Sequence, residues 1–201
     1  MTTLLTAYDE RMRGAGDLCA ASLKKYGPQM GCRVAVYKAQ FAYFSSWSKL
    51  TAIKRWLNGF WPSTWIVWID ADCLLRRPFD LLGDIAAKAH FDMLCSTDWN
   101  GVCLGVFALK RCAWSLWLLD TLVGCGDVVD DDAYGRGLGP KHEQNALKAL
   151  MASFPKINRH IGFLDSAWIT DKPCEDRQFN FPLHHFGGLD QAERLRQMSC
   201  I

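Results

Sequence analysis

Apolar residues are grouped along this chain in two ways, which together indicate alternating strands and helices. Short continuous apolar runs bounded by turn residues predict buried strands, and apolar residues three or four positions apart predict helices. Strands are expected at Leu4–Tyr8, Cys32–Tyr37, Trp65–Asp70, Phe91–Ser96, Val102–Leu109 and Ile157–Leu164, with Phe179–Phe186 leading into Gly187-Gly188. Helices are expected at Asp17–Lys25, Trp47–Leu57, Phe79–Ala89, Ala113–Val123, Glu143–Met151 and Asp190–Met198. Strands that alternate with helices predict an α/β fold, here a single mixed, mostly parallel sheet flanked by helices.

The length and composition fit one folded domain spanning residues 1–201. Half of the residues are hydrophobic and nine are tryptophan, which argues against a disordered chain. Only the Gly- and Asp-rich stretch from Gly124 to Lys141 resembles a long loop. Such loops in compact domains are usually functional or disordered.

The net charge argues against a nucleic-acid partner, and the hydropathy argues against a membrane span. The formal net charge is +2, so nothing favours a polyanion, and we expect no nucleic-acid partner. No apolar run approaches the roughly 20 residues that span a bilayer, and the N-terminus lacks the basic segment of a signal peptide. We expect no membrane span in this chain, although the sequence leaves open a Golgi-type anchor that has been removed.

The nine cysteines are an odd number, and no two form a C-x-x-C pair. This spacing excludes the usual zinc-binding and thioredoxin-like signatures. Several of the cysteines lie within apolar runs, where a thiol behaves as a small core residue. Free buried thiols favour a reducing compartment, so a cytoplasmic location is expected.

The run Trp65–Asp70 stops abruptly at two carboxylates, Asp70 and Asp72. Ligands of α/β sheets bind at the carboxyl ends of the strands, where these side chains are expected. Two neighbouring aspartates repel each other unless a cation is present, and Mg²⁺ or Mn²⁺ is usually bound by one or two carboxylates plus substrate phosphates. The pattern indicates a metal–diphosphate site, with a solvated turn at the strand end as the alternative.

Four segments then follow one another in an order typical of one enzyme family. They are Trp47-Ser-Lys49-Leu50, Trp68-Ile-Asp70-Ala-Asp72, Asp98-Trp-Asn100-Gly101-Val-Cys103-Leu-Gly105-Val-Phe107, and His142-Glu143-Gln144 followed by His184-His185-Phe-Gly187-Gly188. Over residues 40 to 190 the chain resembles the metal-dependent glycosyltransferases of the GT-A fold. It is most similar to the galactosyl/mannosyl/xylosyltransferase family of yeast Golgi mannosyltransferases and plant xyloglucan xylosyltransferases. Cys103 replaces an asparagine of the family pattern, so the family's sugar preference does not carry over.

The resemblance implies a divalent metal, Mn²⁺ or Mg²⁺, at three residues. Asp72 would bind the metal directly, Asp70 would lie nearer the ribose and a metal-bound water, and His185 would be a further ligand. Imidazole favours Mn²⁺ over Mg²⁺. Gly187 and Gly188 would let the backbone approach the diphosphate.

The resemblance also implies where the nucleotide sugar binds. Lys49 would face phosphate from a helix start, or would be an ordinary solvated lysine. The nucleoside is expected beside Thr6, Ala7, Tyr8 and Asp9, with Tyr8 either stacked on the base or packed in the core. Asp98, Asn100 and Gly101 would contact the donor sugar, although Asn100-Gly101 is also a common turn signal.

Glu143 and Gln144 are the candidate catalytic residues, together with Asp131 in the run Asp130–Asp132. In an inverting enzyme Glu143 or one of these aspartates would be the general base. In a retaining enzyme, like the family it resembles, Gln144 or Glu143 would stabilise an oxocarbenium-like state. An acid in the first turn of a helix also has a purely structural explanation.

These observations predict a glycosyltransferase that moves a sugar from a UDP-sugar, or second a GDP-sugar, to a carbohydrate or glycoconjugate acceptor. The Gly124–Lys141 loop would be a lid over the donor. A metal-dependent phosphohydrolase with Asp70 as nucleophile and a non-catalytic nucleotide- or sugar-binding module remain alternatives. A nucleotidyltransferase is disfavoured, because no Gly-rich, Arg-containing loop of the right form follows the first strand.

Overall fold

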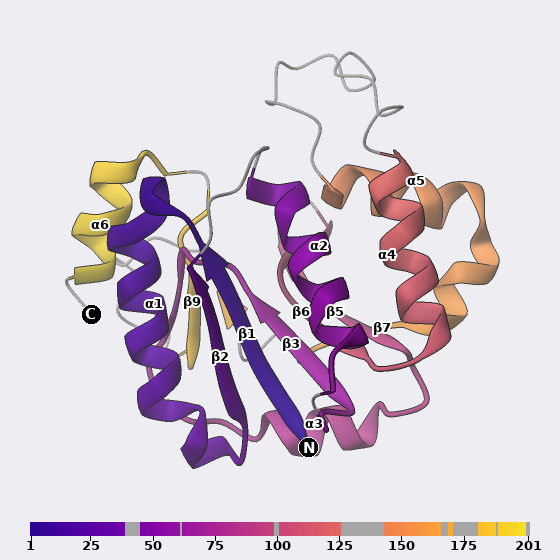
Figure 1. Ribbon diagram of the computed structural model, residues 1–201, viewed down its shortest axis with the longest axis horizontal. Coiled ribbons are helices and arrows are strands. Elements are labelled where there is room, and N and C mark those ends of the chain that lie inside the picture. Colours follow the sequence, from indigo (N-terminus) through magenta and orange to yellow (C-terminus); the bar gives the residue numbers. More distant parts are fainter. Residues whose placement is uncertain are drawn as a thin grey trace.

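The computed structural model describes residues 1–38, 45–60, 62–98, 101–125, 143–165, 169–170, 181–187 and 189–199 (Figure 1). Its main sheet has six strands in the order β2-β1-β3-β6-β5-β7. They are β1 (Thr2–Tyr8), β2 (Arg33–Lys38), β3 (Trp65–Ile69), β5 (Met93–Asp98), β6 (Gly101–Lys110) and β7 (Ile161–Phe163). Strand β1 pairs in parallel with β2 and β3, and β5 pairs in parallel with β7. Strand β6 runs antiparallel to both of its neighbours, so the predicted mixed, mostly parallel sheet is confirmed.

A second, three-stranded sheet was not predicted. It consists of β4 (Cys73–Leu75), β9 (Leu183–His185) and β8 (Ile169–Thr170), in the order β4-β9-β8. Strands of two or three residues are too short to show a hydrophobic pattern of their own. The antiparallel pairing of β4 with β9 nevertheless matters for function, because it places Cys73 directly opposite His185.

Helices cover both faces of the main sheet (Figure 1). The α-helices are α1 (Arg13–Tyr26), α2 (Ser45–Asn58), α3 (Leu81–Ala87), α4 (Ala113–Cys125), α5 (Glu143–Ser153) and α6 (Gln191–Ser199). Short 3-10 helices are η1 (Glu10–Met12), η2 (Pro28–Met30) and η4 (Pro155–His160). The six predicted α-helices are all observed, with ends that differ by a few residues.

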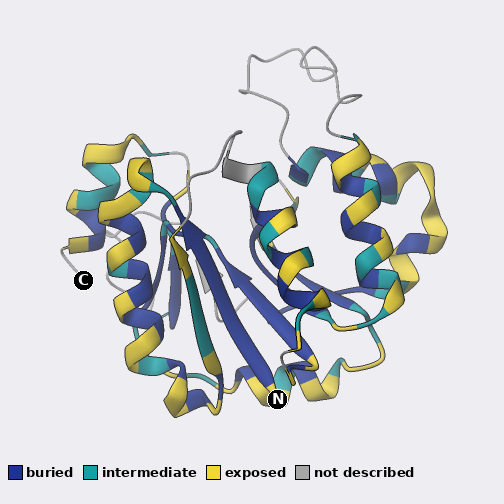
Figure 2. Ribbon diagram, in the orientation of Figure 1, coloured by how far each residue is buried: buried dark blue, intermediate teal, exposed yellow. Residues whose placement is uncertain are grey.

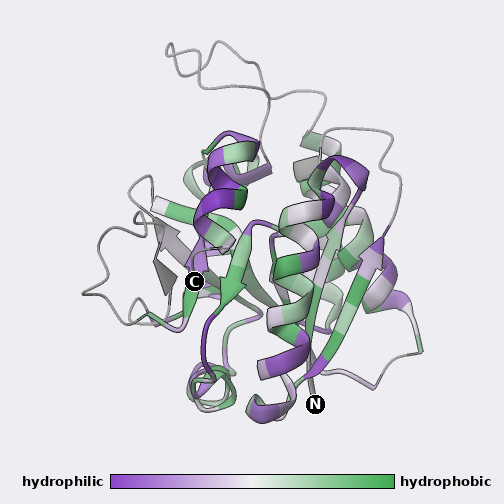
Figure 3. Cartoon of the chain, turned by 90° about the vertical axis from the view of Figure 1, so that its left-hand side faces the viewer, coloured by the Kyte–Doolittle hydropathy of each residue, from purple (hydrophilic) through white to green (hydrophobic). Residues whose placement is uncertain are grey.

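The core lies on both faces of the main sheet because its central strands are buried throughout (Figure 2). Ile66 and Trp68 pack in one cluster with residues of α2, α4 and α5, whereas Trp65 and Val67 pack in another with residues of α1 and α3. This alternation follows from the period of two in a strand. Figure 3 shows hydrophobic residues along the strands, whereas the helices carry both hydrophobic and hydrophilic residues.

Two sequence predictions need comment. The strand predicted at Ile157–Leu164 is wrong in its first half, where η4 begins with Pro155 and continues to His160; only Ile161–Phe163 forms a strand. Proline at the first helical position favours this turn, because its fixed φ suits a helix start. The predicted lid, Gly124–Lys141, begins within α4, which ends at Cys125, and its remaining residues lie outside the described residues.

In the part of the chain that the structure describes, no helix combines the length and apolar character needed to cross a membrane.

Candidate active site

Asp70 follows β3 directly and is anchored there by its neighbours. Its backbone N–H donates to the carbonyl of Gly105 on β6 over 2.8 Å. The indole Nε1 of Trp68 donates to Asp70 Oδ1 over 2.6 Å, and the Lys49 ammonium lies 3.0 Å from the same oxygen. The carboxylate is therefore held in one orientation at the carboxyl end of the strand, with a quarter of its side chain exposed.

Lys49, on the first turns of α2, lies between two carboxylates. Its Nζ is 2.8 Å from Glu143 Oε1 and donates to the backbone carbonyl of Leu104 over 2.9 Å. The side chains of Lys49 and Glu143 are both buried. Burial by itself would lower the pKa of Lys49, but the charges of Asp70 and Glu143 outweigh it and hold that pKa above its usual value. The lysine is thus a fixed cation that links α2 to β3 and α5.

Glu143, the first residue of α5, has one carboxylate oxygen with no partner among the described residues. Oε1 pairs with Lys49, whereas the buried Oε2 accepts no hydrogen bond from any described residue. Gln144 Oε1 accepts from the backbone N–H of Leu104 over 3.1 Å. Buried carboxylate oxygens are normally satisfied, so an orphaned one beside Asp70 is suited to accept a hydrogen bond from a ligand.

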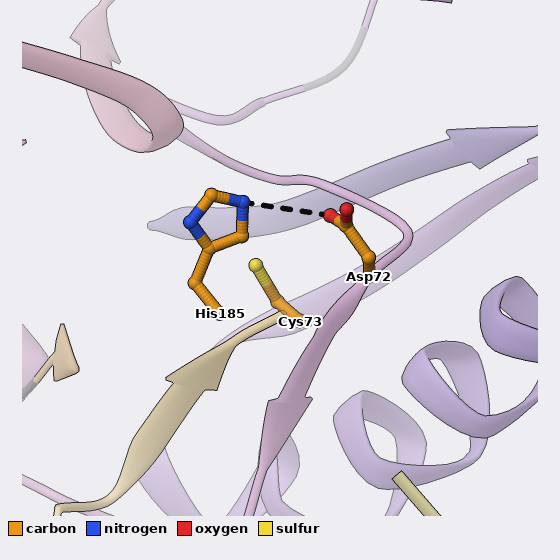
Figure 4. A group of neighbouring side chains, drawn as sticks. All are labelled: Asp72, Cys73 and His185. Carbon is orange, nitrogen blue, oxygen red and sulfur yellow. Dashed lines mark ion pairs between the residues drawn. The ribbon is translucent and has the colours of Figure 1, made fainter. Parts of the chain in front are cut away.

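Asp72, Cys73 and His185 bring three metal-ligating groups together (Figure 4). Their ligand atoms all lie within 4.8 Å of one another, and His185 Nε2 is 3.6 Å from Asp72 Oδ1. That separation is too long for a hydrogen bond, but it suits two donors that bind one cation. Asp72 and His185, both predicted as ligands, are therefore neighbours, whereas Asp70 lies outside this group and contacts Lys49 instead.

The His185 ring is packed between two glycines. A Cβ added to Gly105 or to Gly187 would come within 2.8 Å of the imidazole Cε1. Burial by itself would lower the pKa of His185, but a hydrogen bond with Cys103 and the charge of Asp72 raise it to about 9. Gly187, predicted to contact diphosphate, thus also gives the imidazole its space.

Arg194, on α6, is a site residue that the sequence did not indicate. Its Nε lies 3.5 Å from Asp72 Oδ2, and the guanidinium also donates to the carbonyls of Phe186 and Leu189. Cys73 likewise was counted only as one of the nine cysteines and was given no role. Both were missed because the approach of Arg194 to Asp72 depends on the packing of α6, and the proximity of Cys73 to His185 depends on the pairing of β4 with β9, rather than on a local motif.

The donors around Asp72 fit a divalent cation. A carboxylate oxygen satisfies hard ions such as Mg²⁺ and Mn²⁺, and an imidazole nitrogen shifts the preference towards a transition metal. The neighbouring carboxylate of Asp70 adds negative charge at the same strand end. The observed donor set is thus consistent with the metal site implied by the sequence.

The residues predicted to bind the nucleoside lie at the end of β1. Thr6 and Ala7 are buried within the strand, and Tyr8 is buried with its ring against Gly16. The Tyr8 hydroxyl donates to Asp17 Oδ1 over 2.6 Å. Asp9 caps η1 and pairs with Arg11, which lowers its pKa. Their contact with a nucleoside remains a prediction.

The residues predicted to bind the donor sugar lie where β5 turns into β6. Asp98 pairs with Gly101, which has a φ of +98° that favours glycine. Nothing is described of the Asp98 side chain, and Asn100, Asp131 and Gly188 fall outside the described residues.

Comparison with known families identifies the chain at this point. The model of the galactosyl transferase GMA12/MNN10 family matches residues 83–186, just over half of the chain. The chain belongs to this family. The match contains Glu143, Gln144 and His185 but begins after Asp70 and Asp72. Membership in the GMA12/MNN10 family confirms the family predicted from the motifs.

Two named relatives are similar over part of their length. The Saccharomyces cerevisiae protein "Probable alpha-1,6-mannosyltransferase MNN10" is 25% identical over 159 residues, covering 65% of this chain and 39% of that protein. An Arabidopsis thaliana protein named as a glycosyltransferase is 30% identical over 92 residues, covering 42% of this chain and 20% of that protein. The chain therefore spans less than half the length of these relatives.

Solved structures share the fold over nearly the whole chain. A glycosyltransferase involved in the glycosylation of the major capsid of PBCV-1 superposes with a TM-score of 0.75 at 15% identity, over 100% of this chain and 99% of that one. The galactosyltransferase LgtC, solved with donor and acceptor sugar analogs, has a TM-score of 0.58 at 11% identity, over 98% and 95% of the two chains. At these identities the similarity establishes the fold alone, which is the predicted GT-A fold.

Proposed function

We propose that this chain is a glycosyltransferase that moves a sugar from a nucleotide-diphosphate sugar to a carbohydrate or glycoconjugate acceptor. A UDP-sugar is the proposed donor, with a GDP-sugar second. The observation that carries the proposal is the meeting of two groups at the end of β3: the metal-ligating pair Asp72 and His185, and the buried pair Lys49 and Glu143. Family membership supports the same reaction class.

On the donor side, Asp72 and His185 would bind Mn²⁺ or Mg²⁺, with Asp70 beside them as the third predicted ligand. Such a cation neutralises the charge that develops on a diphosphate leaving group. Arg194 adds a guanidinium next to Asp72, and its donor geometry suits phosphate oxygens. Gly187 and Gly188 would lie along the same diphosphate.

Further along the donor, Thr6, Ala7, Tyr8 and Asp9 would surround the nucleoside, and Asp98, Asn100 and Gly101 would contact the transferred sugar. These contacts are part of the proposal. They are supported by the positions of β1 and of the β5–β6 turn in the sheet, since β1 pairs with β3 and β6 pairs with both β3 and β5.

Glu143 and Gln144 would lie at the reacting face of the sugar. The free Oε2 of Glu143 could accept the proton of an acceptor hydroxyl in an inverting reaction. In a retaining reaction, the same oxygen or the Gln144 amide would stabilise positive charge on the sugar ring. In either case Lys49 positions Glu143, because its buried ammonium lies 2.8 Å from Oε1 of that carboxylate. Asp131 stays a second candidate for the base.

Thermal unfolding with UDP, GDP and ADP, each with and without Mn²⁺, tests the donor site. A ligand at 100 times its dissociation constant stabilises a protein by about 2.7 kcal/mol. We expect a shift with one nucleotide that requires metal and disappears in Asp72→Asn, but persists in the control Asp120→Asn, whose exposed carboxylate pairs with Lys54. Absence of any nucleotide shift would contradict the proposal and direct attention to phosphate-ester hydrolysis.

Transfer itself is then measured by nucleotide release from the donor that binds, across a panel of carbohydrate acceptors. Acceptor-dependent release establishes the transferase. Nucleotide binding without release for any acceptor would instead favour a non-catalytic binding module.

A further inference from the structure

The thiol of Cys73 lies beside Asp72 and His185, although the carboxylate–histidine pattern of the predicted metal site does not include it. Cys73 follows Asp72 and is the first residue of β4. Its sulfur belongs to the group of three ligand atoms that lie within 4.8 Å of one another. Figure 4 shows this sulfur pointing towards the gap between the His185 ring and the Asp72 carboxylate.

Strand pairing fixes this arrangement. Cys73 and His185 are direct partners in the antiparallel pair of β4 and β9. Directly opposite residues in such a pair point to the same face of the sheet, with their Cβ atoms roughly 4.5–5.5 Å apart. The pairing continues beyond them, since the Phe186 N–H donates to the Asp72 carbonyl over 2.9 Å. The thiol and the imidazole are therefore preorganised beside Asp72 by main-chain hydrogen bonds.

The two glycines beside the imidazole add to this preorganisation. Because Gly105 and Gly187 both leave no room for the ring to move towards them, His185 stays on the side of Cys73. The residue is itself fully buried, so larger reagents are kept from its thiol.

We propose that Cys73 is a protein ligand of the metal site, together with Asp72 and His185, and that its thiolate adds affinity for thiophilic divalent cations such as Zn²⁺ and Co²⁺ at the site proposed above for Mn²⁺ or Mg²⁺. Thiolate and imidazole donors select these ions, whereas carboxylate donors alone suit Mg²⁺ and Mn²⁺. On binding, a sulfur–metal bond forms and the thiol proton passes to solvent, so uptake of the ion releases a proton. The inference rests on the metal site of the proposed function and names one more of its ligands.

Titration of the whole protein with Co²⁺ tests this assignment by absorption. A sulfur-to-cobalt charge-transfer band in the near ultraviolet is expected for the wild type, at one ion per chain. The band should be lost in Cys73→Ser and retained in Cys103→Ser. Cys103 is the matched control, because it is also buried and in contact with His185 but lies outside the group of three ligand atoms. Circular dichroism checks that both variants fold.

Affinity provides a second readout. Cys73→Ser should weaken Zn²⁺ binding at least about tenfold, a loss that even outer-shell partners of a metal produce, with a smaller change for Mn²⁺. Co²⁺ binding without the band, a band that survives Cys73→Ser, or a band lost in Cys103→Ser would each overturn the assignment. If Mn²⁺-dependent nucleotide binding persists in that case, only the assignment of Cys73 as a ligand is wrong. If neither Co²⁺ nor Mn²⁺ binds the wild type, the metal site of the proposed function is wrong as well.

Discussion

The Lys49 ammonium lies 2.8 Å from Glu143 Oε1 in an ion pair that is buried on both sides. The same ammonium contacts Asp70, so one cation joins the end of β3 to the first residue of α5. Removing one partner of a buried pair leaves an uncompensated charge, which costs far more than the pair contributes. This relationship makes the site and the stability of the fold depend on the same residue.

Replacing Lys49 by methionine should therefore destabilise the protein by about 3–5 kcal/mol, because two carboxylates lose their cation in a buried position. Urea unfolding measures the change. The matched control is Lys54→Met, also on α2, which breaks a partly exposed pair with Asp120 and should cost less than about 1 kcal/mol. An equal loss of unfolding free energy in the two variants would show that burial of the Lys49–Glu143 pair does not increase its effect on stability.

Substitution of Glu143 separates catalysis from binding. Glu143→Ala should lower turnover by at least about 10²-fold, because it removes the carboxylate proposed to act on the acceptor or the sugar. The metal-dependent nucleotide shift should remain. Glu143→Gln keeps an oxygen for Lys49 and is the variant to use if the alanine form is unstable. Near-wild-type turnover in both would remove Glu143 from the mechanism.

The described cysteines should differ sharply in reactivity. Cys19 and Cys95 are fully buried, and burial raises the pKa of Cys19 to about 12 and raises that of Cys95 as well. Cys112 and Cys125 are part-exposed. Iodoacetamide at neutral to mildly alkaline pH should label the second pair in the folded protein and the first pair only after unfolding, as peptide mapping by mass spectrometry would report. Labelling of Cys19 at the rate of Cys112 would contradict the packing around α1.

The fold was predictable where a local pattern was strong. The continuous apolar run before Asp70 is the buried strand β3, and the helical spacing from Trp47 is α2. Patterns failed where a strand was very short, as in β4, or where apolar residues also fit a turn, as in η4. Local periodicity carries no information on a three-residue pairing between distant segments.

The site was predictable in part for the same reason. Motif order identified Asp72 and His185 as neighbours, and the structure places their ligand atoms together. Lys49 was expected either to face phosphate or to be a solvated lysine. The second alternative is wrong, because the side chain is buried and its ammonium contacts Asp70 and Glu143, two residues far from it in the sequence. The approach of Arg194 from α6 had no local signal at all.

The two glycines that flank His185 provide the last prediction. A Cβ at Gly105 or Gly187 would lie 2.8 Å from the imidazole, a distance that forces the ring to move. Gly105→Ala and Gly187→Ala should each destabilise the fold by about 1–3 kcal/mol, the usual cost of overpacking, and should abolish the metal-dependent thermal shift. Gly124→Ala in α4 is the control, because no described residue outside its own helix turn comes within 4 Å of the added Cβ. It should be neutral or stabilise the helix by up to about 1 kcal/mol. Wild-type metal affinity in Gly105→Ala and Gly187→Ala would mean that the orientation of the imidazole does not control the metal site.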